Sequence, residues 1–360
     1  MKRTLQAAYR RAYEGINTRL PGWAGGRFAA YSRPSSIVLL LTERCNARCV
    51  HCDIWKNRGR EDSPDATQWK TLLSDLRRWL GPVQVTLTGG EALLRPFAID
   101  LVRHGSSLGL FIELLSHGYW EDQTKIEQLA LAAPGRVTIS LDGLGEIHSV
   151  IRGRTGFFEK THRTLQTLNR IRRERRLNLS ILLKTVIMDQ NLDSVCDIAH
   201  FAHERGLEVF YQPIEQNYNT SEDLRWFEHS PTWPKDPAHA IAVVEKLIAL
   251  KRQGLPIANS AAQLEVMIPY FRDPESWQRL TQSHTAHRRR FMCAALAFVQ
   301  IQANGDVRIC ARKPPVGNIT QRPIRAIWRD RPHWWENGCC FEPHNEPTPS
   351  SLLPQEPGVE

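Results

Sequence analysis

Short apolar runs alternate with longer helical patterns between residues 37 and 211. Runs that are continuous rather than alternating are typical of strands covered on both faces. Six strands separated by helices predict successive βα units and a parallel sheet, and six units are fewer than the eight of a closed barrel. The sequence therefore predicts an α/β fold, a partial (β/α)6 barrel of the TIM type. The six runs are Ile37–Leu41, Val83–Leu87, Leu110–Leu115, Val137–Leu141, Ile181–Val186 and Leu207–Tyr211.

Helical periodicity fills the intervals between these strands. Apolar residues recur every three or four positions from Trp69 to Leu80, which predicts a helix with one buried face. Four further segments have the same character: Ile99–Val102, Ile126–Leu131, Leu165–Ile171 and Val195–Phe201.

Residues 2–20 predict a basic amphipathic helix ahead of the barrel. Its apolar positions lie on one face: Leu5, Ala8, Tyr9, Ala12, Tyr13 and Ile16. Such a helix could bind a membrane surface or a partner. Its modest amphipathicity favours the alternative, a helix packed on its own domain.

Composition and charge exclude some classes of protein. The chain of 360 residues is 41% hydrophobic and 24% charged, which excludes disorder and membrane-only folds. The longest apolar run, Ile37–Leu41, is too short to span a membrane, and no secretory signal is evident, so we expect a cytoplasmic protein without transmembrane segments. The net charge of +9 permits an acidic partner: nucleic acid, an anionic membrane or an acidic electron donor.

Two arginine-rich runs contribute to this charge, at residues 170–176 and 288–290. Nucleic-acid binding is one interpretation. A solvated helix face is favoured over it, so we do not expect a nucleic-acid partner. Docking of an acidic flavodoxin or ferredoxin is the third interpretation.

Three of the eight cysteines stand together directly after the first predicted strand, as Cys45, Cys49 and Cys52. Clustered cysteines in a chain too cysteine-poor for a disulfide scaffold indicate metal ligands. Three thiolates in one loop can hold three irons of a cubane cluster and leave the fourth iron open. Zinc is the rival, with His51 as a fourth ligand, but His51 adjoins Cys52 and shared tetrahedral ligation is awkward.

Polar motifs also follow the later strands. Gly89-Gly90-Glu91 follows the second strand, where glycines permit close backbone approach and a glutamate can accept hydrogen bonds from an ammonium group. Ser140 and Asp142 end the fourth strand and could bind a ribose, although turn formation explains either motif equally well. Lys184 and Gln212 end the fifth and sixth strands. These positions share the C-terminal face of the barrel, which carries active sites in such folds.

The cysteine spacing and its place after the first strand resemble the radical S-adenosylmethionine (SAM) enzymes. The resemblance implies that Cys45, Cys49 and Cys52 hold a [4Fe–4S] cluster whose open iron chelates SAM. One electron then releases a 5′-deoxyadenosyl radical that abstracts hydrogen from a substrate, and a flavodoxin- or ferredoxin-type protein supplies the electron. The site residues implied to bind SAM are His51 near the adenine, Gly89, Gly90 and Glu91 at the amino group, Ser140, Asp142 and Gln212, and Arg152 at the carboxylate.

The C-terminal cysteines resemble the auxiliary cluster domains called SPASM and twitch. Asn304-Gly305-Asp306 predicts a hairpin turn between Cys293 and Cys310, and Cys339 and Cys340 follow. The full SPASM pattern has seven cysteines, so this resemblance implies one additional iron–sulfur cluster, held by Cys293, Cys310 and one or both of Cys339 and Cys340. Cys196 is expected to be an ordinary buried residue.

These expectations define an organisation and a function. The predicted segments are an N-terminal helical extension (1–36), the barrel (37–220), a helical connection (221–287), a small C-terminal iron–sulfur auxiliary domain (288–345) and a disordered tail (346–360). The predicted function is SAM cleavage and hydrogen abstraction from an unidentified peptide, carbohydrate or other small molecule. The alternatives are an RNA-modifying radical SAM enzyme and a non-catalytic iron–sulfur electron-transfer or scaffold protein.

Overall fold

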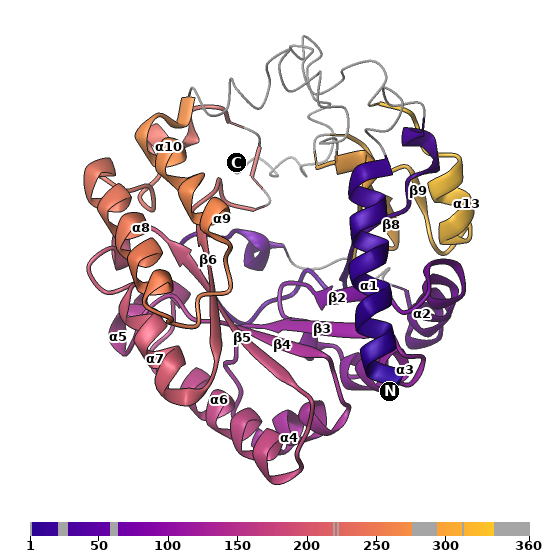
Figure 1. Ribbon diagram of the computed structural model, residues 1–360, viewed down its shortest axis with the longest axis horizontal. Helices are drawn as coiled ribbons and strands as arrows, with labels where there is room; N and C mark the ends of the chain where they lie inside the picture. Colours follow the sequence, from indigo (N-terminus) through magenta and orange to yellow (C-terminus); the bar gives the residue numbers. More distant parts are fainter. Residues whose placement is uncertain are drawn as a thin grey trace, which may run out of the picture.

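The six predicted strands lie side by side in a single sheet (Figure 1). The computed structural model describes residues 2–20, 28–57, 64–218, 220–221, 223–275, 294–311 and 313–334. Neighbouring strands pair in parallel in chain order from β1 to β6, which confirms the partial barrel. The strands are β1 (Ser36–Leu40), β2 (Gln84–Thr88), β3 (Phe111–Ser116), β4 (Arg136–Ser140), β5 (Ser180–Ile187) and β6 (Glu208–Pro213).

Helices connect these strands and pack against the sheet. In α2, the side chain of Asp65 accepts a hydrogen bond from Gln68 N and Gln68 returns one, while Gly81 at φ 81° ends the helix. Trp69, Leu73 and Leu76 on its inner face are fully buried. The helices are α2 (Ala66–Leu80), α3 (Ala98–Ser107), α4 (Gln123–Leu131), α5 (Glu146–Arg152), α6 (Phe157–Glu174) and α7 (Asp197–Arg205), of which the sequence did not predict α5.

The C-terminal segment extends the same sheet. The predicted hairpin forms around Gly305, but its first strand also pairs in parallel with β1, with Leu39 opposite Ile301. The sheet order is therefore β6-β5-β4-β3-β2-β1-β7-β8-β9. Beyond β6 lie α8 (Pro237–Arg252), α9 (Ala261–Glu265) and α10 (Met267–Arg272), and the C-terminal elements are β7 (Phe298–Ile301), β8 (Asp306–Arg308), β9 (Gly317–Asn318) and α13 (Ile324–Arg329).

The N-terminal helix α1 (Lys2–Arg19) packs on its own domain, as the favoured interpretation predicted. The Tyr9 hydroxyl donates to Leu80 O at 2.6 Å and the Tyr13 hydroxyl to Pro34 O at 2.8 Å. The predicted contact face is only partly correct: Tyr13 is buried, whereas Leu5 and Ile16 are 64% and 53% exposed. These two hydroxyls donate to backbone carbonyls of other segments, and hydrophobic periodicity cannot predict such contacts.

The arginine-rich run at residues 170–176 lies at the C-terminal end of α6, directly before β5 begins. This places it at the opposite end of the sheet from the cysteine loop, which follows β1. Arg170 pairs with Glu127 and Glu174, and Arg172 donates to Asn169 Oδ1 at 2.6 Å. The geometry argues against docking of an electron donor on this run and favours the solvated-face interpretation. Among the described helices, none is long and apolar enough to cross a membrane.

Candidate functional site

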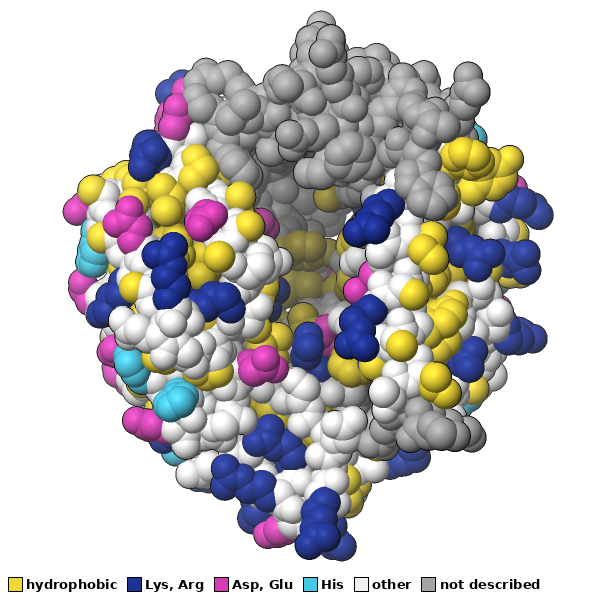
Figure 2. Space-filling view, viewed as in Figure 1, with side chains coloured by type: hydrophobic (Ala, Val, Ile, Leu, Met, Phe, Trp, Pro, Cys, Tyr) yellow, Lys and Arg dark blue, Asp and Glu magenta, His cyan; other side chains and the backbone are white. Residues whose placement is uncertain are grey.

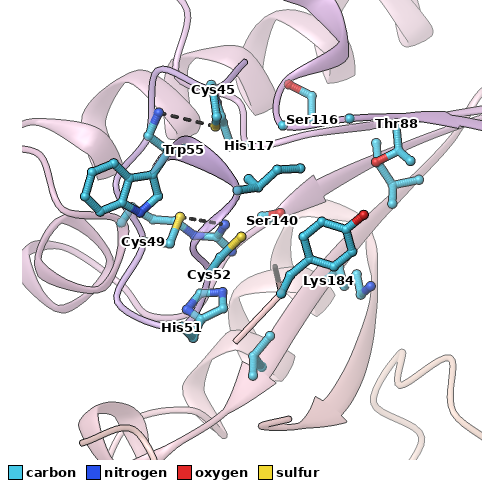
Figure 3. Close-up of a pocket in the computed structure, with 18 of the residues that line it drawn as sticks. Cys45, Cys49, His51, Cys52, Trp55, Thr88, Ser116, His117, Ser140 and Lys184 are labelled. Carbon is cyan, nitrogen blue, oxygen red and sulfur yellow. Dashed lines mark hydrogen bonds between the residues drawn. The ribbon is translucent and has the colours of Figure 1, made fainter. Parts of the chain in front are cut away.

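A cavity of about 370 Å³ opens at the C-terminal ends of the strands. Figure 3 shows Cys45, Cys49 and Cys52 on one side of it and Thr88 and Lys184 on the other. Figure 2 shows the surface hollowed between α9 and α1. The predicted site residues that line the cavity are Cys45, Cys49, His51, Cys52, Gly89, Gly90, Ser140, Arg152, Lys184 and Gln212. Ser116 and His117 at the end of β3 also line the cavity, so its walls come from six consecutive βα units.

The cysteine loop is held by the end of α5. Arg48 N donates to Arg152 O at 3.1 Å, and Val50 N donates to Ile151 O at 3.0 Å. Gly153 caps α5 at φ 70°, and a Cβ there would lie 2.2 Å from Arg48 O. Only glycine permits this backbone conformation and this approach together. The sequence pattern Ile151-Arg152-Gly153 therefore positions the cysteine loop as well as supplying a cation.

Burial disfavours the thiolate form of all three cysteines. Burial raises the pKa of Cys45 to about 12, and burial likewise raises the pKa of Cys49 and of Cys52. Metal binding would therefore release protons. Within the described ranges, no group of three His, Cys, Asp or Glu side chains is placed to hold a single metal ion. A cubane fits these thiols better than mononuclear zinc, because each thiolate then meets a separate iron.

The Gly89–Gly90 pair lets the loop after β2 pack on the loop after β1. A Cβ on Gly89 would lie 2.6 Å from Thr42 O, and one on Gly90 would lie 2.4 Å from Arg44 O. Gly90 N donates to Thr42 O at 2.8 Å. The sequence predicted close approach to a ligand, whereas the structure also shows close approach to the backbone that leads into Cys45.

Glu91 lies behind the cavity wall and is 1% exposed. It accepts hydrogen bonds from Leu93 N at 3.1 Å, Ser116 Oγ at 3.1 Å and His117 N at 2.9 Å. Burial raises its pKa to about 7, against the effect of these donors. In this geometry Glu91 ties the end of β3 to the loop after β2, and the predicted contact of its carboxylate with an ammonium ligand stays a prediction.

Asp142 is also not among the residues that line the cavity, and its predicted ribose contact stays a prediction. It is fully buried, its Oδ2 lies 2.5 Å from Arg152 Nη2, and its Oδ1 accepts from Val186 N at 3.0 Å. Burial alone would raise the pKa of Asp142, but the Arg152 guanidinium holds it below its usual range. Arg152 in turn donates to Cys49 Sγ at 3.6 Å. Asp142 therefore positions Arg152, and through it the environment of Cys49.

Two buried histidines near the site were not predicted. His117 accepts from Tyr119 N at Nδ1, so its Nε2 carries the proton and faces Asn46 Oδ1 at 2.7 Å. His148 accepts from Asp142 N at Nδ1. Burial lowers the pKa of both to about 3, so both rings are neutral. Isolated histidines carry no sequence signal that distinguishes these two from the other histidines of the chain.

Polar groups without partners face the place where a ligand would lie. His51 lines the cavity, and its buried Nδ1 has no hydrogen-bond partner in the described part of the chain; neither does the Nε1 of Trp55 beside it. On β5, Lys184 is paired in register with Ser140, and its ammonium group has no hydrogen bond or ion pair with any described residue. Burial lowers the pKa of Lys184. Unsatisfied buried groups of this kind fit a polar ligand.

Of the four predicted C-terminal cluster ligands, only Cys310 lies within the described residues. It is buried and follows β8. Cys293, Cys339 and Cys340 lie outside the described residues. Cys196 is buried at the start of α7, as expected of an ordinary core residue.

Comparison with known proteins relates part of the chain to one family. Residues 39–202, which are less than half of the chain, match the model of the radical SAM superfamily. This segment is therefore similar to the radical SAM superfamily, the family that the cysteine loop also resembles.

Particular relatives differ in how much of the chain they match. The sporulation killing factor maturation protein SkfB of Bacillus subtilis is 30% identical over 49% of this chain and 42% of its own length. Pre-heme d1 synthase of Dinoroseobacter shibae is 24% identical over 83% of this chain and 74% of its own. The structure of Streptococcus suis SuiB bound to SAM superposes with a TM-score of 0.63 at 15% identity, covering 85% of this chain and 68% of SuiB. The chain therefore spans less than half the length of SkfB, and its fold resembles that of SuiB.

Proposed function

We propose that this chain reductively cleaves SAM and uses the resulting radical to abstract hydrogen from a substrate. The observation that carries the proposal is the convergence of three thiols from one loop with polar strand ends around one cavity. A cavity of this volume is within the range of small-molecule sites. When bound, the cluster held by Cys45, Cys49 and Cys52 supplies one electron, which yields methionine and a 5′-deoxyadenosyl radical.

The chain's own residues bind and orient SAM. His51 and Trp55 offer unpartnered ring nitrogens on the cysteine side of the cavity. Two cationic side chains, Arg152 and Lys184, line the cavity, and they differ in how many protein partners they have. Arg152 is engaged by Asp142 and Cys49, whereas the ammonium group of Lys184 has no partner among the described residues. Lys184 is therefore the better placed of the two to meet a carboxylate.

The substrate class is proposed only broadly, as a peptide, carbohydrate or other small molecule. The relatives above are named for sporulation killing factor maturation and pre-heme d1 synthesis, and these names point to different substrates. RNA modification is less favoured, because two arginines of the 170–176 run are engaged within the protein. A flavodoxin- or ferredoxin-type protein is the proposed electron donor.

The test is SAM cleavage by reconstituted, reduced protein. We expect 5′-deoxyadenosine and methionine from the wild type, and none from Cys45→Ala, Cys49→Ala or Cys52→Ala. Cys196→Ala is the matched control, since that cysteine is buried and does not line the cavity. If a wild-type preparation with an intact cluster cleaves no SAM in the presence of its substrate, the proposal fails in favour of an electron-transfer or scaffold role.

We further propose that Cys293, Cys310 and one of Cys339 and Cys340 hold a second cluster. Wild-type protein is then expected to bind about eight irons, and a variant lacking the first three cysteines about four. A folded triple variant that binds no iron would show that no second cluster exists.

A further inference from the structure

A second cavity, of about 430 Å³, lies at the opposite end of the sheet, where β3, β4 and β5 begin. One wall is α1, through Gln6 and Arg10, and the others are the segments that lead into these three strands. Its lining includes three arginines, Arg10, Arg136 and Arg176, and no Asp or Glu. The proposed SAM chemistry uses none of these residues. Figure 2 shows Lys and Arg side chains gathered over the lower part of this face and around α1.

Close packing around Phe111 builds this cavity. A Cβ on Gly135 would lie 2.5 Å from the Phe111 ring, so a side chain there would displace the ring. The Arg10 guanidinium lies 4.6 Å from the centroid of that ring and the Arg136 guanidinium 5.9 Å from it. Two like charges are therefore held against one aromatic ring, in a geometry that the surrounding backbone maintains.

The acids near these arginines compensate their charge only in part. Arg136 Nη1 is 3.8 Å from Glu113 Oε1, a long ion pair, and Glu113 already accepts from Thr138 Oγ1 at 2.6 Å. The buried Nε of Arg136 has no partner in the described part of the chain. Glu14, one turn along α1, offsets part of the charge of Arg10, while burial lowers the pKa of Arg10. An anion in the cavity would satisfy the remaining donors and remove the repulsion.

We propose that this cavity binds a small molecule carrying a phosphoryl group, through Arg10, Arg136 and Arg176. The planar fork of a guanidinium matches two phosphate oxygens, and charge-assisted hydrogen bonds of this kind are among the strongest in proteins. The cavity volume is in the range of small-molecule sites and leaves space for the rest of the ligand beside Leu110, Leu177 and Asn178. Because the ligand contacts both α1 and the strand entrances, its binding stabilises the packing of α1 on the barrel.

Calorimetric titration of the reconstituted protein with inorganic phosphate tests the proposal, with acetate at matched ionic strength as the comparison anion. We expect saturable binding of phosphate and at least about a tenfold loss of affinity in Arg10→Gln, since one bidentate guanidinium contact is removed. Arg11→Gln is the matched control, because it makes the same charge change on the same helix at an exposed residue outside the cavity. We expect its affinity to be unchanged.

A second variant on the opposite wall keeps the test independent of α1. Arg176→Gln is expected to weaken phosphate binding as Arg10→Gln does, with circular dichroism and SAM cleavage unchanged in both. Absence of saturable phosphate binding would overturn the proposal. Equal weakening by Arg10→Gln and Arg11→Gln would overturn it in favour of a diffuse surface charge, and equal affinity for acetate would overturn the assignment to phosphoryl groups.

Discussion

The two ends of the parallel sheet carry cavities of similar size and opposite chemistry. At the C-terminal ends, thiols, neutral histidines and Arg152, which is paired with the buried Asp142, surround about 370 Å³. At the N-terminal ends, three arginines and a covering helix surround about 430 Å³. The difference follows from chain direction. The loops that leave the strands place the motif residues side by side at one end of the sheet. The short segments that enter the strands line the other cavity with backbone atoms and single arginine side chains.

Breaking the buried ion pair is expected to have the largest effect on stability. Arg152→Met leaves Asp142 charged and fully buried, so we expect a loss of about 3–5 kcal/mol in the free energy of unfolding by urea at pH 7. Arg136→Met is the matched variant at the other end. Its ion pair is 3.8 Å long and its side chain 32% exposed, so we expect about 1 kcal/mol or less.

The double variant Arg152→Met/Asp142→Leu is expected to recover most of the loss, because no buried charge remains. Arg152 holds the pKa of Asp142 in the folded protein below its usual range. The contribution of this pair to the free energy of unfolding is therefore present above the pKa that Asp142 has in the unfolded chain. It is lost as the pH falls through the lower pKa of the folded protein. Equal losses in Arg152→Met and Arg136→Met would remove the distinction between the two ends.

Gly153→Ala tests whether α5 positions the cysteine loop. The φ of 70° costs about 1–2 kcal/mol for any L-residue, and the Cβ would meet Arg48 O at 2.2 Å, which adds roughly 1–3 kcal/mol. Gly156→Ala is the control, with the same left-handed conformation at a φ of 70° and only Glu159 Oε2, at 3.8 Å, near the added Cβ. We expect Gly153→Ala alone to lower iron content as well as the unfolding free energy. Identical behaviour of the two variants would show that the contact with Arg48 is unimportant.

Acidification is expected to weaken the C-terminal end through its neutral histidines. Burial lowers the pKa of His148 to about 3, so below pH 6.5 the unfolded chain binds a proton that the folded chain does not. The contribution of neutral His148 to the free energy of unfolding is therefore fully present above about pH 6.5, the pKa of histidine in the unfolded chain. It falls between about pH 6.5 and 3, and about 2 kcal/mol is lost at pH 5.

His148→Asn keeps an acceptor for Asp142 N but cannot take up this proton. The difference in unfolding free energy between wild type and variant should therefore shrink by about 2 kcal/mol from pH 7 to pH 5. A difference that stays constant over this range would contradict a neutral His148.

The smallest effect is expected from the exposed arginines at the end of α6. Arg173→Gln/Arg175→Gln should change the unfolding free energy by no more than about 0.5 kcal/mol, since both side chains are exposed. SAM cleavage with a flavodoxin donor should also be unchanged, because these residues lie at the opposite end of the sheet from the cysteine loop. A selective loss with flavodoxin but not with a chemical reductant would place donor docking at the N-terminal end and contradict the comparison.

Local pattern was sufficient to predict most of the sheet. Each of the six strands lies within two residues of its predicted bounds, because the apolar residues that bury a strand lie close together in sequence. The cluster of Cys45, Cys49 and Cys52 could also be recognised from the sequence, since the three thiols lie within eight residues of one another. What these features share is that the interacting residues are close in sequence.

Tertiary structure decided the features that depend on distant partners. Sequence could not show that β7 pairs with β1, because their residues are about 260 positions apart and the strand is short. It assigned Asp142 and Glu91 to ligands, whereas the fold supplies each with protein partners from other elements: Arg152 and Val186 for Asp142, and Ser116 and His117 for Glu91. Burial decides which polar groups pair with each other and which, like Lys184, stay available to a ligand, and burial is established only when all the strands have packed.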